Sequence, residues 1–291
     1  METLIILLEA KRLQFIKLFK TTKLVNNIVL IIIVLGMGAA FLWLMELNMN
    51  LALIIVGALI VTLFLYSRFS KAWLGKQAYK YIFDYYRALA AYYYREPDFT
   101  ALDIQEQAGF DIEEFRSLKI LKNEYGIVSR NTVRAEFDRR PVSVSDAGVR
   151  VMKDQKVDVA FFGRIFKFEL DRQFDDHVII HHRRAKEGPW PEGFGDFLVV
   201  EERDDFIVLS QSGTLPASLN QELIKKLQNF VLDDYLSDAS LVIFDRHAYL
   251  LMSYADVVMN VVYEQPVNAE AMKRFEDDLE SIKGLVDLLP H

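Results

Sequence analysis

The sequence contains no cysteine among its 291 residues, and it has few prolines, 7, and few histidines, 5. The lack of cysteine excludes a disulfide framework, a cysteine nucleophile, a thiolate zinc site and an iron–sulfur cluster. The sequence also lacks a phosphate-binding loop, a His-Glu-x-x-His zinc motif and a Gly-x-Ser-x-Gly nucleophile motif. No catalytic, cofactor-binding or metal-binding residue is therefore assigned, and we expect no cofactor and, on balance, no enzyme.

Charged residues are missing from two long apolar stretches near the N-terminus. Over 24–67, 34 of 44 residues are hydrophobic. Residues 28–45 carry no charge, and as a helix they would extend about 27 Å, enough to cross a bilayer. Residues 51–66, extended at their start by 47–50, reach a similar length. We therefore predict a transmembrane helical hairpin over 24–67, with a polar turn centred near Asn48.

Two other interpretations of these stretches are buried core helices and a cleaved signal peptide. Two adjacent uncharged stretches of this length exceed what a globular core normally uses. A signal peptide is not expected, because the apolar run 4–8 is short and is followed at once by Glu9, Lys11 and Arg12. Thr62 is the one deep polar side chain in either span, which favours an anchor over a transport path.

The distribution of lysine and arginine predicts how the hairpin is oriented. Residues 1–23 and 68–87 each hold five basic residues, and the turn between the spans holds none. Because cytoplasmic flanks carry the excess of Lys and Arg, both termini and the main domain are expected in the cytoplasm. Gly36 and Ala40 of the first span would face Gly57 of the second, so that the two backbones could approach closely.

Helical periodicity continues on both sides of the hairpin. Residues 1–23 form a basic amphipathic arm whose apolar stripe could lie on anionic lipid or pack on the soluble domain of the same chain, with lipid favoured. Residues 68–97 form a stalk helix that Pro97 ends. Seven tyrosines lie between Tyr79 and Tyr94. We interpret them as the face that docks the stalk on the folded domain, with a ligand-stacking surface as the alternative.

Residues 98–291 are expected to form a cytoplasmic α+β domain. Capping residues and periodicity predict helices over 100–108, 111–121, 219–235 and 268–289. Alternating patterns predict strands over 132–137, 141–145, 157–170, 177–182, 196–201, 205–209, 241–244 and 249–252. Hairpin turns are expected at 202–204 and 245–247, and a surface loop over 186–195. The predicted fold is a transmembrane hairpin, a stalk helix, and a mixed, mainly antiparallel sheet with a C-terminal helix.

The charge pattern argues against nucleic acid as a partner. The order helix, glycine, helix, strand over 100–129 resembles a winged helix-turn-helix. However, the second helix begins with Asp111, Glu113 and Glu114, and these carboxylates would face phosphates. From residue 68 onward the chain holds 29 basic and 38 acidic residues, so this part is expected to be repelled by nucleic acid and by an anionic membrane leaflet alike.

The histidines give no clear metal site. His177 and His181 lie on a predicted strand, where four residues span about 13 Å, too far for a shared metal ion. His182 would point to the opposite face of the strand, and His291 is terminal. Acid–base pairs are conceivable where histidines stand beside aspartates, but a solvated turn next to a strand is the favoured interpretation of both sites. These pairs combine Asp175 and Asp176 with His177, and Asp245 with His247.

Several segments between 76 and 290 resemble a bacterial family of two-span inner-membrane proteins with a cytoplasmic domain of unknown function. They run in the same order as in that family: 111–117, 161–170 with Phe174, 178–180, 206–209, 215–216 with the helix after it, a final strand, Pro266 and the closing helix. The resemblance implies a location in the bacterial inner membrane. Members of this family are often encoded beside LemA-type membrane proteins, so it also implies such a partner. It supplies no catalytic residues.

The sequence thus predicts a membrane-anchored interaction or scaffold module whose partners are membrane lipid and either another protein or a second copy of the chain. The alternative is a membrane-tethered hydrolase or small-ligand sensor, in which His177, His247 and nearby aspartates share a cleft. That alternative requires the two histidines to lie within about 12 Å of each other.

Overall fold

The computed structural model describes residues 1–47, 49–95, 97–105, 108–137, 139–153, 155–184, 190–217, 219–254 and 266–290. The chain divides into two compact units. The first comprises Met1–Tyr85 and Val261–Ala269, and the second comprises Tyr86–Asn260 and Glu270–His291. The described strands all belong to the second unit.

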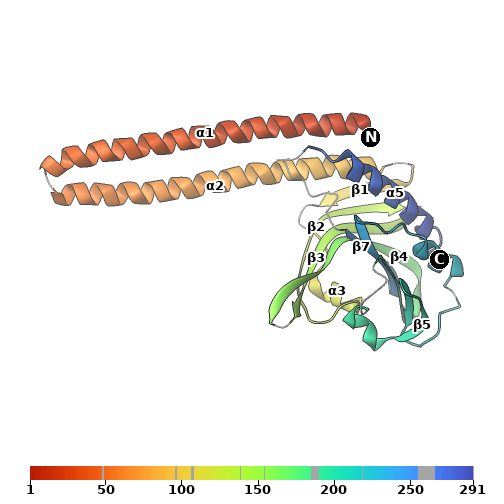
Figure 1. Ribbon diagram of the computed structural model, residues 1–291. Helices are drawn as coiled ribbons and strands as arrows, with labels where there is room; N and C mark the ends of the chain where they lie inside the picture. The colour runs from red at the N-terminus through yellow and green to blue at the C-terminus, as the bar shows by residue number, and fades with distance from the viewer. Residues whose placement is uncertain are drawn as a thin grey trace. The chain divides into compact units, whose positions relative to one another are not determined.

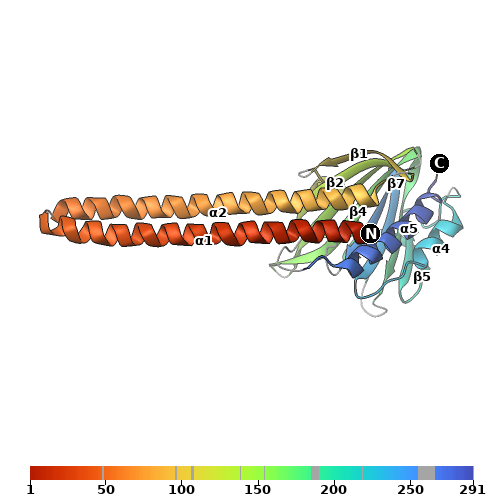
Figure 2. The same ribbon diagram turned by 90° about the horizontal axis from the view of Figure 1, so that it is seen from above.

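The first unit is an antiparallel helical hairpin. Helix α1 covers Glu2–Leu47 and helix α2 covers Met49–Tyr93, and the two run side by side in both views (Figures 1 and 2). The ring of Phe15 stacks on Tyr81 with centroids 4.5 Å apart, and the Tyr66 hydroxyl donates to Asn26 Oδ1 at 3.0 Å. At about 1.5 Å per residue each helix is about 70 Å long, more than twice the thickness of a bilayer's hydrocarbon core.

Helix α1 is long and apolar enough over Glu2–Trp43 to cross a membrane, and its most apolar window is wholly unburied. Within the described residues it is the one helix that meets both criteria. A helix of this kind near the N-terminus fits a membrane anchor, and by the same criteria it fits a signal sequence. The second span, over 51–66 in α2, stays a prediction.

The expected close approach at small residues is wrong. A Cβ atom placed on Gly36 or Gly57 would meet no heavy atom of the described residues within 4 Å. Both glycines lie on exposed faces of their helices rather than in the α1–α2 interface. The two helices are antiparallel, as expected, but these glycines do not bring their backbones together.

The N-terminal arm is the first part of α1, and its apolar stripe packs on the same chain. Leu8, Arg12 and Phe15, spaced by four and three residues, are buried. Glu9 accepts hydrogen bonds from Arg12 Nε at 2.9 Å and from the Val267 backbone at 3.1 Å. These contacts lie within the first unit, so both predicted roles, contact with lipid and packing on the folded domain, stay predictions. Other apolar residues of the arm are exposed: Ile6, Leu7, Leu13 and Leu18.

The second unit is built on a seven-stranded sheet. Its strands are β1 (Phe99–Gln105), β2 (Glu124–Phe137), β3 (Arg140–Lys153), β4 (Lys156–Arg183), β5 (Leu198–Glu202), β6 (Phe206–Ser210) and β7 (Leu236–Tyr254). Their order is β1-β2-β3-β4-β6-β5, and β7 pairs with β4. Each pairing between described strands is antiparallel, so the prediction of a mixed sheet is wrong. Short hairpins such as β2–β3 join antiparallel neighbours, whereas parallel pairs need long crossovers.

Strands β4 and β7 form the spine of the sheet. The first part of β4 pairs with β3 and the last part with β6, while β7 pairs along both parts. The register shifts between the pairs Glu169–His247 and Val178–Ile243, because β4 carries extra residues there and bulges. Opposite this bulge Asp245 has a φ of 50°. The predicted turn at 245–247 is therefore wrong, because these residues form an irregularity within strand β7. The two strands predicted over 157–170 and 177–182 are in fact parts of the single strand β4.

Local capping signals predicted the start of helix α3 correctly but wrongly predicted a helix over 100–108. Residues 100–108 were expected to form a helix, but Phe99–Gln105 is strand β1. Phe99 is buried against Phe137 and Tyr94, at 5.1 and 5.2 Å between centroids, so pairing with β2 overrides the local signal. Helix α3 (Ile112–Ser117) starts as predicted but ends earlier, and its N-cap Asp111 accepts from the Glu114 backbone at 2.7 Å.

The remaining helices of the second unit are α4, α5 and a short 3-10 helix. Helix α4 covers Gln221–Gln228, shorter than predicted, and Asn220 is its N-cap. Helix α5 covers Ala269–Val286 and confirms the predicted closing helix. A short 3-10 helix, η1, covers Glu192–Asp196 in the predicted surface loop. The last predicted strand, 249–252, is part of β7. Ser218 and residues 186–189 of the predicted loop lie outside the described residues.

The sheet carries a packed layer on each face (Figure 1). On one face, the end of α2 and α5 cover β3 and β4, and on the other α3 and η1 close an aromatic core. The Tyr93 ring meets Phe275 edge-on at 4.8 Å, and its hydroxyl donates to the Met272 carbonyl at 2.8 Å. Tyr86 and Tyr94 are also buried. The end of the tyrosine-rich segment is thus part of the core of the second unit, whereas Tyr81 packs on Phe15 of α1 and Tyr79 is exposed.

Candidate functional site

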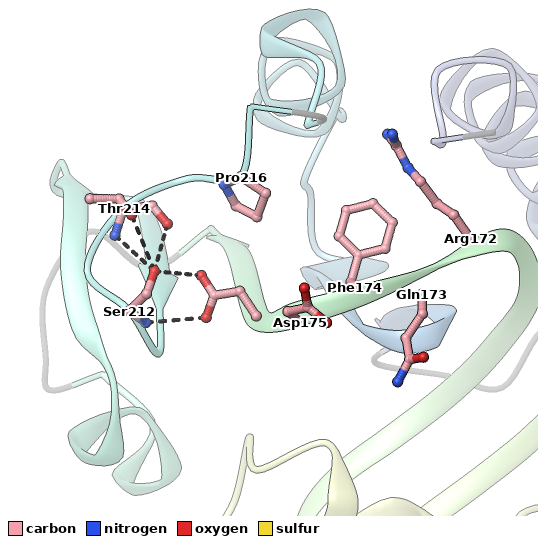
Figure 3. Close-up of a pocket in the computed structure, with 8 residues that line it drawn as sticks. Arg172, Gln173, Phe174, Asp175, Ser212, Thr214 and Pro216 are labelled. Carbon is pink, nitrogen blue, oxygen red and sulfur yellow. Dashed lines mark hydrogen bonds between the residues drawn. The ribbon is translucent and has the colours of Figure 1, made fainter.

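A surface pocket of about 320 Å³ opens beside the bulge in β4 (Figure 3). One wall comes from the bulged strand and the other from the loop between β6 and α4. The lining side chains are Arg172, Gln173, Phe174, Asp175, Asp176, Ser212, Thr214 and Pro216. The guanidinium of Arg172 lies over the Phe174 ring, 5.3 Å from its centroid.

Asp176 ties the two walls of this pocket together. Its carboxylate accepts hydrogen bonds from Ser210 Oγ at 2.6 Å, from Ser212 Oγ at 2.8 Å and from the Ser212 backbone at 3.1 Å. The His177 backbone adds a fourth, at 2.9 Å. Burial raises the pKa of Asp176, but these hydrogen bonds together outweigh it and the pKa is lowered. Asp176 therefore stays ionised and holds the loop in place.

The chemistry that this pocket offers is that of a polar binding site. Figure 3 shows Ser212 and Thr214 on the loop side. The Ser212 hydroxyl is hydrogen-bonded to Asp176, and it lies 3.2 Å from the Thr214 hydroxyl. Its lining contains no histidine or lysine, so proton transfer there would depend on carboxylates alone. Since Asp176 is held ionised, the arrangement supports recognition of a small polar ligand better than acid–base catalysis.

His177 is a core residue. Its ring stacks on Phe244 with centroids 4.7 Å apart and meets Phe197 edge-on at 5.0 Å. Burial, with a smaller contribution from the charge of Lys119, lowers the pKa of His177 to about 4. The imidazole is therefore neutral near pH 7, and it is enclosed by aromatic rings rather than directed toward a substrate cleft.

His181 and His182 point to different layers, as a strand requires. The Nδ1 atom of His181 lies 2.7 Å from Ser240 Oγ, and the ring contacts Trp190 and Phe194. Burial lowers the pKa of His181 to about 3, and burial also lowers that of His182. No group of three or more metal-ligating side chains is found among the described residues.

The structure does not bring His177 and His247 into one site. His247 contacts Tyr249, Tyr249 stacks on Phe244, and Phe244 stacks on His177, with centroids 5.9, 5.6 and 4.7 Å apart. Two aromatic rings thus connect the histidines, and no hydrogen bond or ring contact joins them directly within the described part of the chain. The structure gives no support to the shared His/Asp cleft of the hydrolase hypothesis.

One feature that sequence reasoning missed is a buried ion pair on the helix-covered face of the sheet. Arg164 of β4 donates from Nε and Nη2 to Asp146 Oδ1 of β3, at 3.0 and 2.8 Å. Its guanidinium lies over Phe275, 4.5 Å from the ring centroid. The two residues are 18 apart. Arg164 lies in the strand predicted over 157–170 and Asp146 directly after the one predicted over 141–145, so only knowledge of the register would have revealed the pair.

A second missed feature is an exposed apolar surface at the far end of strands β2, β3 and β4. We call it the ribbon face, and it consists of Val128, Arg150, Met152, Val157, Val159 and Phe162. The five apolar members are exposed, Val159 by 56% and Val157 by 49%. A signal for this surface was present in the sequence, because both odd-numbered and even-numbered positions along 149–162 carry apolar residues. A strand with one buried face needs apolar residues only at alternate positions.

No family model and no curated protein matches the chain. Among solved structures, the chain is similar to the crystal structure of the mycobacterial trehalose monomycolate transport factor A, TtfA. The match has 10% sequence identity and a TM-score of 0.35, and it covers 65% of this chain and 89% of that one. A likeness at this level carries no inference about the function of this chain.

Proposed function

We propose that the chain is a membrane-anchored interaction module. Helices α1 and α2 cross the membrane as a hairpin, and the α+β unit on the cytoplasmic side binds a protein partner or a second copy of the chain. The observation that supports this most directly is the continuity of α2, which is helical from the apolar stretch at its start to the core of the sheet unit at its end.

The end of α2 is an integral part of the folded unit. Tyr86, Leu89, Ala90 and Tyr94 are almost completely buried within it. The helix between Tyr66 and Tyr86 is about 30 Å long at about 1.5 Å per residue. The connection between the anchor and the folded unit is therefore a helix and not a flexible linker, as suits a module that presents a partner-binding surface near a membrane.

The direction of insertion follows from charge. Five basic residues on each flank and none in the turn favour a hairpin with both ends in the cytoplasm. The resemblance to a bacterial inner-membrane family points to a LemA-type protein as the partner.

Crosslinking in native membranes tests the proposal. The chain has no cysteine, so single photoreactive labels can be attached to cysteines introduced at exposed positions of the sheet unit, such as Leu198 and Val231. We expect at least one position to capture a discrete protein, either a second membrane protein or another copy of the chain. Recovery of only uncrosslinked monomer from a panel of labels around the whole unit would contradict an interaction role.

The pocket at the β4 bulge favours a second candidate function, that of a small-ligand sensor. Its volume and polar lining suit a small polar molecule. Replacing Thr214 by Trp would fill the pocket from the loop side. If the module senses a ligand there, this variant should lose ligand-induced thermal stabilisation in a screen of polar metabolites. A Val231→Trp control, at a position that is 80% exposed and does not line the pocket, should keep it.

A further inference from the structure

We propose that the ribbon face docks on the anionic surface of the membrane in which the chain is anchored. This inference rests on the proposed anchoring and goes beyond it, because it assigns a second, reversible membrane contact to the folded unit. The surface is the exposed end of β2, β3 and β4, and its occupant is a bilayer surface that carries anionic phospholipid.

The register of the strands places the six side chains on one face. Val128, Gly148 and Phe162 are cross-strand partners, as are Arg150 with Val159, and Met152 with Val157. Directly opposed residues on antiparallel strands project from the same side of a sheet. The face continues the row that holds Asp146 and Arg164, but those two are buried under the helices, whereas the ribbon face is open.

The exposed charges around this face are three cations and one carboxylate, Asp158, which lies between Val157 and Val159 on β4. Arg130, Arg150 and Lys156 are exposed, and none of them forms an ion pair with a carboxylate in the described residues. The carboxylate that shares the face, Asp146, is already bound to Arg164. From residue 68 onward acidic residues exceed basic ones by 38 to 29, so a cationic and apolar surface is a local exception on an acidic unit.

This combination matches a lipid surface. Exposed Arg and Lys side chains attract anionic headgroups, and apolar side chains beside them insert at the boundary between headgroups and acyl chains. The anchor also keeps the bilayer within tens of ångströms of the unit at all times, which raises its effective concentration.

A fluorescence experiment on the full chain in nanodiscs tests the docking. Val157→Cys would carry an environment-sensitive dye, and Val231→Cys, which is 80% exposed and lies outside the ribbon face, is the matched control. The discs would contain phosphatidylcholine alone or mixed with phosphatidylglycerol. We expect a blue shift at position 157 in the anionic discs, and loss of the shift at high salt or with Arg150→Glu and Lys156→Glu together. Position 231 should not respond.

Each other outcome overturns the inference. A dye at position 157 that reports water in both discs excludes docking, and so does a shift that is equal in neutral and anionic discs. A shift that instead appears in detergent and grows with protein concentration identifies a second copy as the occupant. Thermal unfolding of the charge-reversal variant shows whether that variant is folded. Quenching of the dye at position 157 by nitroxide-labelled lipid, in the protein without the charge reversal, gives an independent readout of docking. Failure of docking with intact insertion of the hairpin leaves the proposed anchoring unaffected.

Discussion

Single titratable residues in this molecule are tuned by burial in opposite directions. Burial lowers the pKa values of His177 and His181, whereas burial raises the pKa of Asp278 of α5, which lies beside Tyr254. Because the protonation state of each group differs between the folded and unfolded chain, each contributes a pH-dependent part of the free energy of unfolding.

His177 should destabilise the protein in mild acid. Its pKa is about 4 in the folded chain and near 6.5 when unfolded, so the unfolded state binds more protons between these values. Stability is therefore expected to fall as the pH drops from 6.5 to 4, by about 2 kcal/mol from this residue. His177→Phe, which keeps an aromatic ring against Phe244, should flatten the dependence. Equal slopes for both proteins in urea unfolding from pH 4 to 7 would refute this.

Asp278 should act in the other direction. Burial, opposed by the hydrogen bond from the Tyr254 hydroxyl at 3.2 Å, raises its pKa to about 7, above the value of 3.8 for an unperturbed Asp. The folded state binds more protons in this window, so stability falls as the pH rises from 4 to 7. At pH 8, Asp278→Asn should raise the free energy of unfolding by about 1–3 kcal/mol, while the exposed Asp277→Asn changes little. A destabilised Asp278→Asn at pH 8 would contradict the assignment.

At the scale of elements, long-range pairing decides where local signals fail. The starts of α3 and α5 were predictable, because Asp111 caps its own helix and Pro266 precedes the other. Strand β1 and the unbroken β7 were not, because the pairing partners of both lie far along the chain. The candidate pocket was equally hidden, since Asp176 meets Ser210 and Ser212 across more than 30 residues.

The pair Arg164–Asp146 should be the most sensitive contact between β3 and β4. Removing one partner leaves a buried, uncompensated charge, so Asp146→Leu or Arg164→Met alone should cost about 3–5 kcal/mol. The double variant removes both charges and should be more stable than either single variant. Urea unfolding followed by tryptophan fluorescence measures all three. Additive losses in the double variant would show that the pair is not coupled.

The Asp176 clamp should stabilise the loop between β6 and α4. Asp176→Ala removes the acceptor for four donors, two of them hydroxyls. We expect a loss of about 1–3 kcal/mol and faster amide exchange at Ser212. Asp175→Ala, at the exposed neighbouring position, should stay within about 0.5 kcal/mol of the wild type. Similar losses in both variants would show that the hydrogen bonds to Asp176 are not responsible.

At the scale of the whole molecule, composition was more informative than motif. The uncharged stretches and the tyrosine-rich segment predicted an apolar helix and a helical docking face, and the structure contains the first and, at the end of that segment, the second. The ribbon face was not predicted, because exposure depends on which part of a sheet the helices leave open. The histidine cleft was not found because Phe244 and Tyr249 occupy the space between the two predicted partners.

The most direct test of the account is the sidedness of two single cysteines in intact cells. A cysteine at Asn50, in the turn of the hairpin, should react with a membrane-impermeant maleimide added outside spheroplasts. A cysteine at Val231, in the sheet unit, should react only after the membrane is permeabilised. Labelling of position 231 from outside, or protection of position 50 in intact spheroplasts but not in inverted vesicles, would contradict a cytoplasmic module anchored by a transmembrane hairpin.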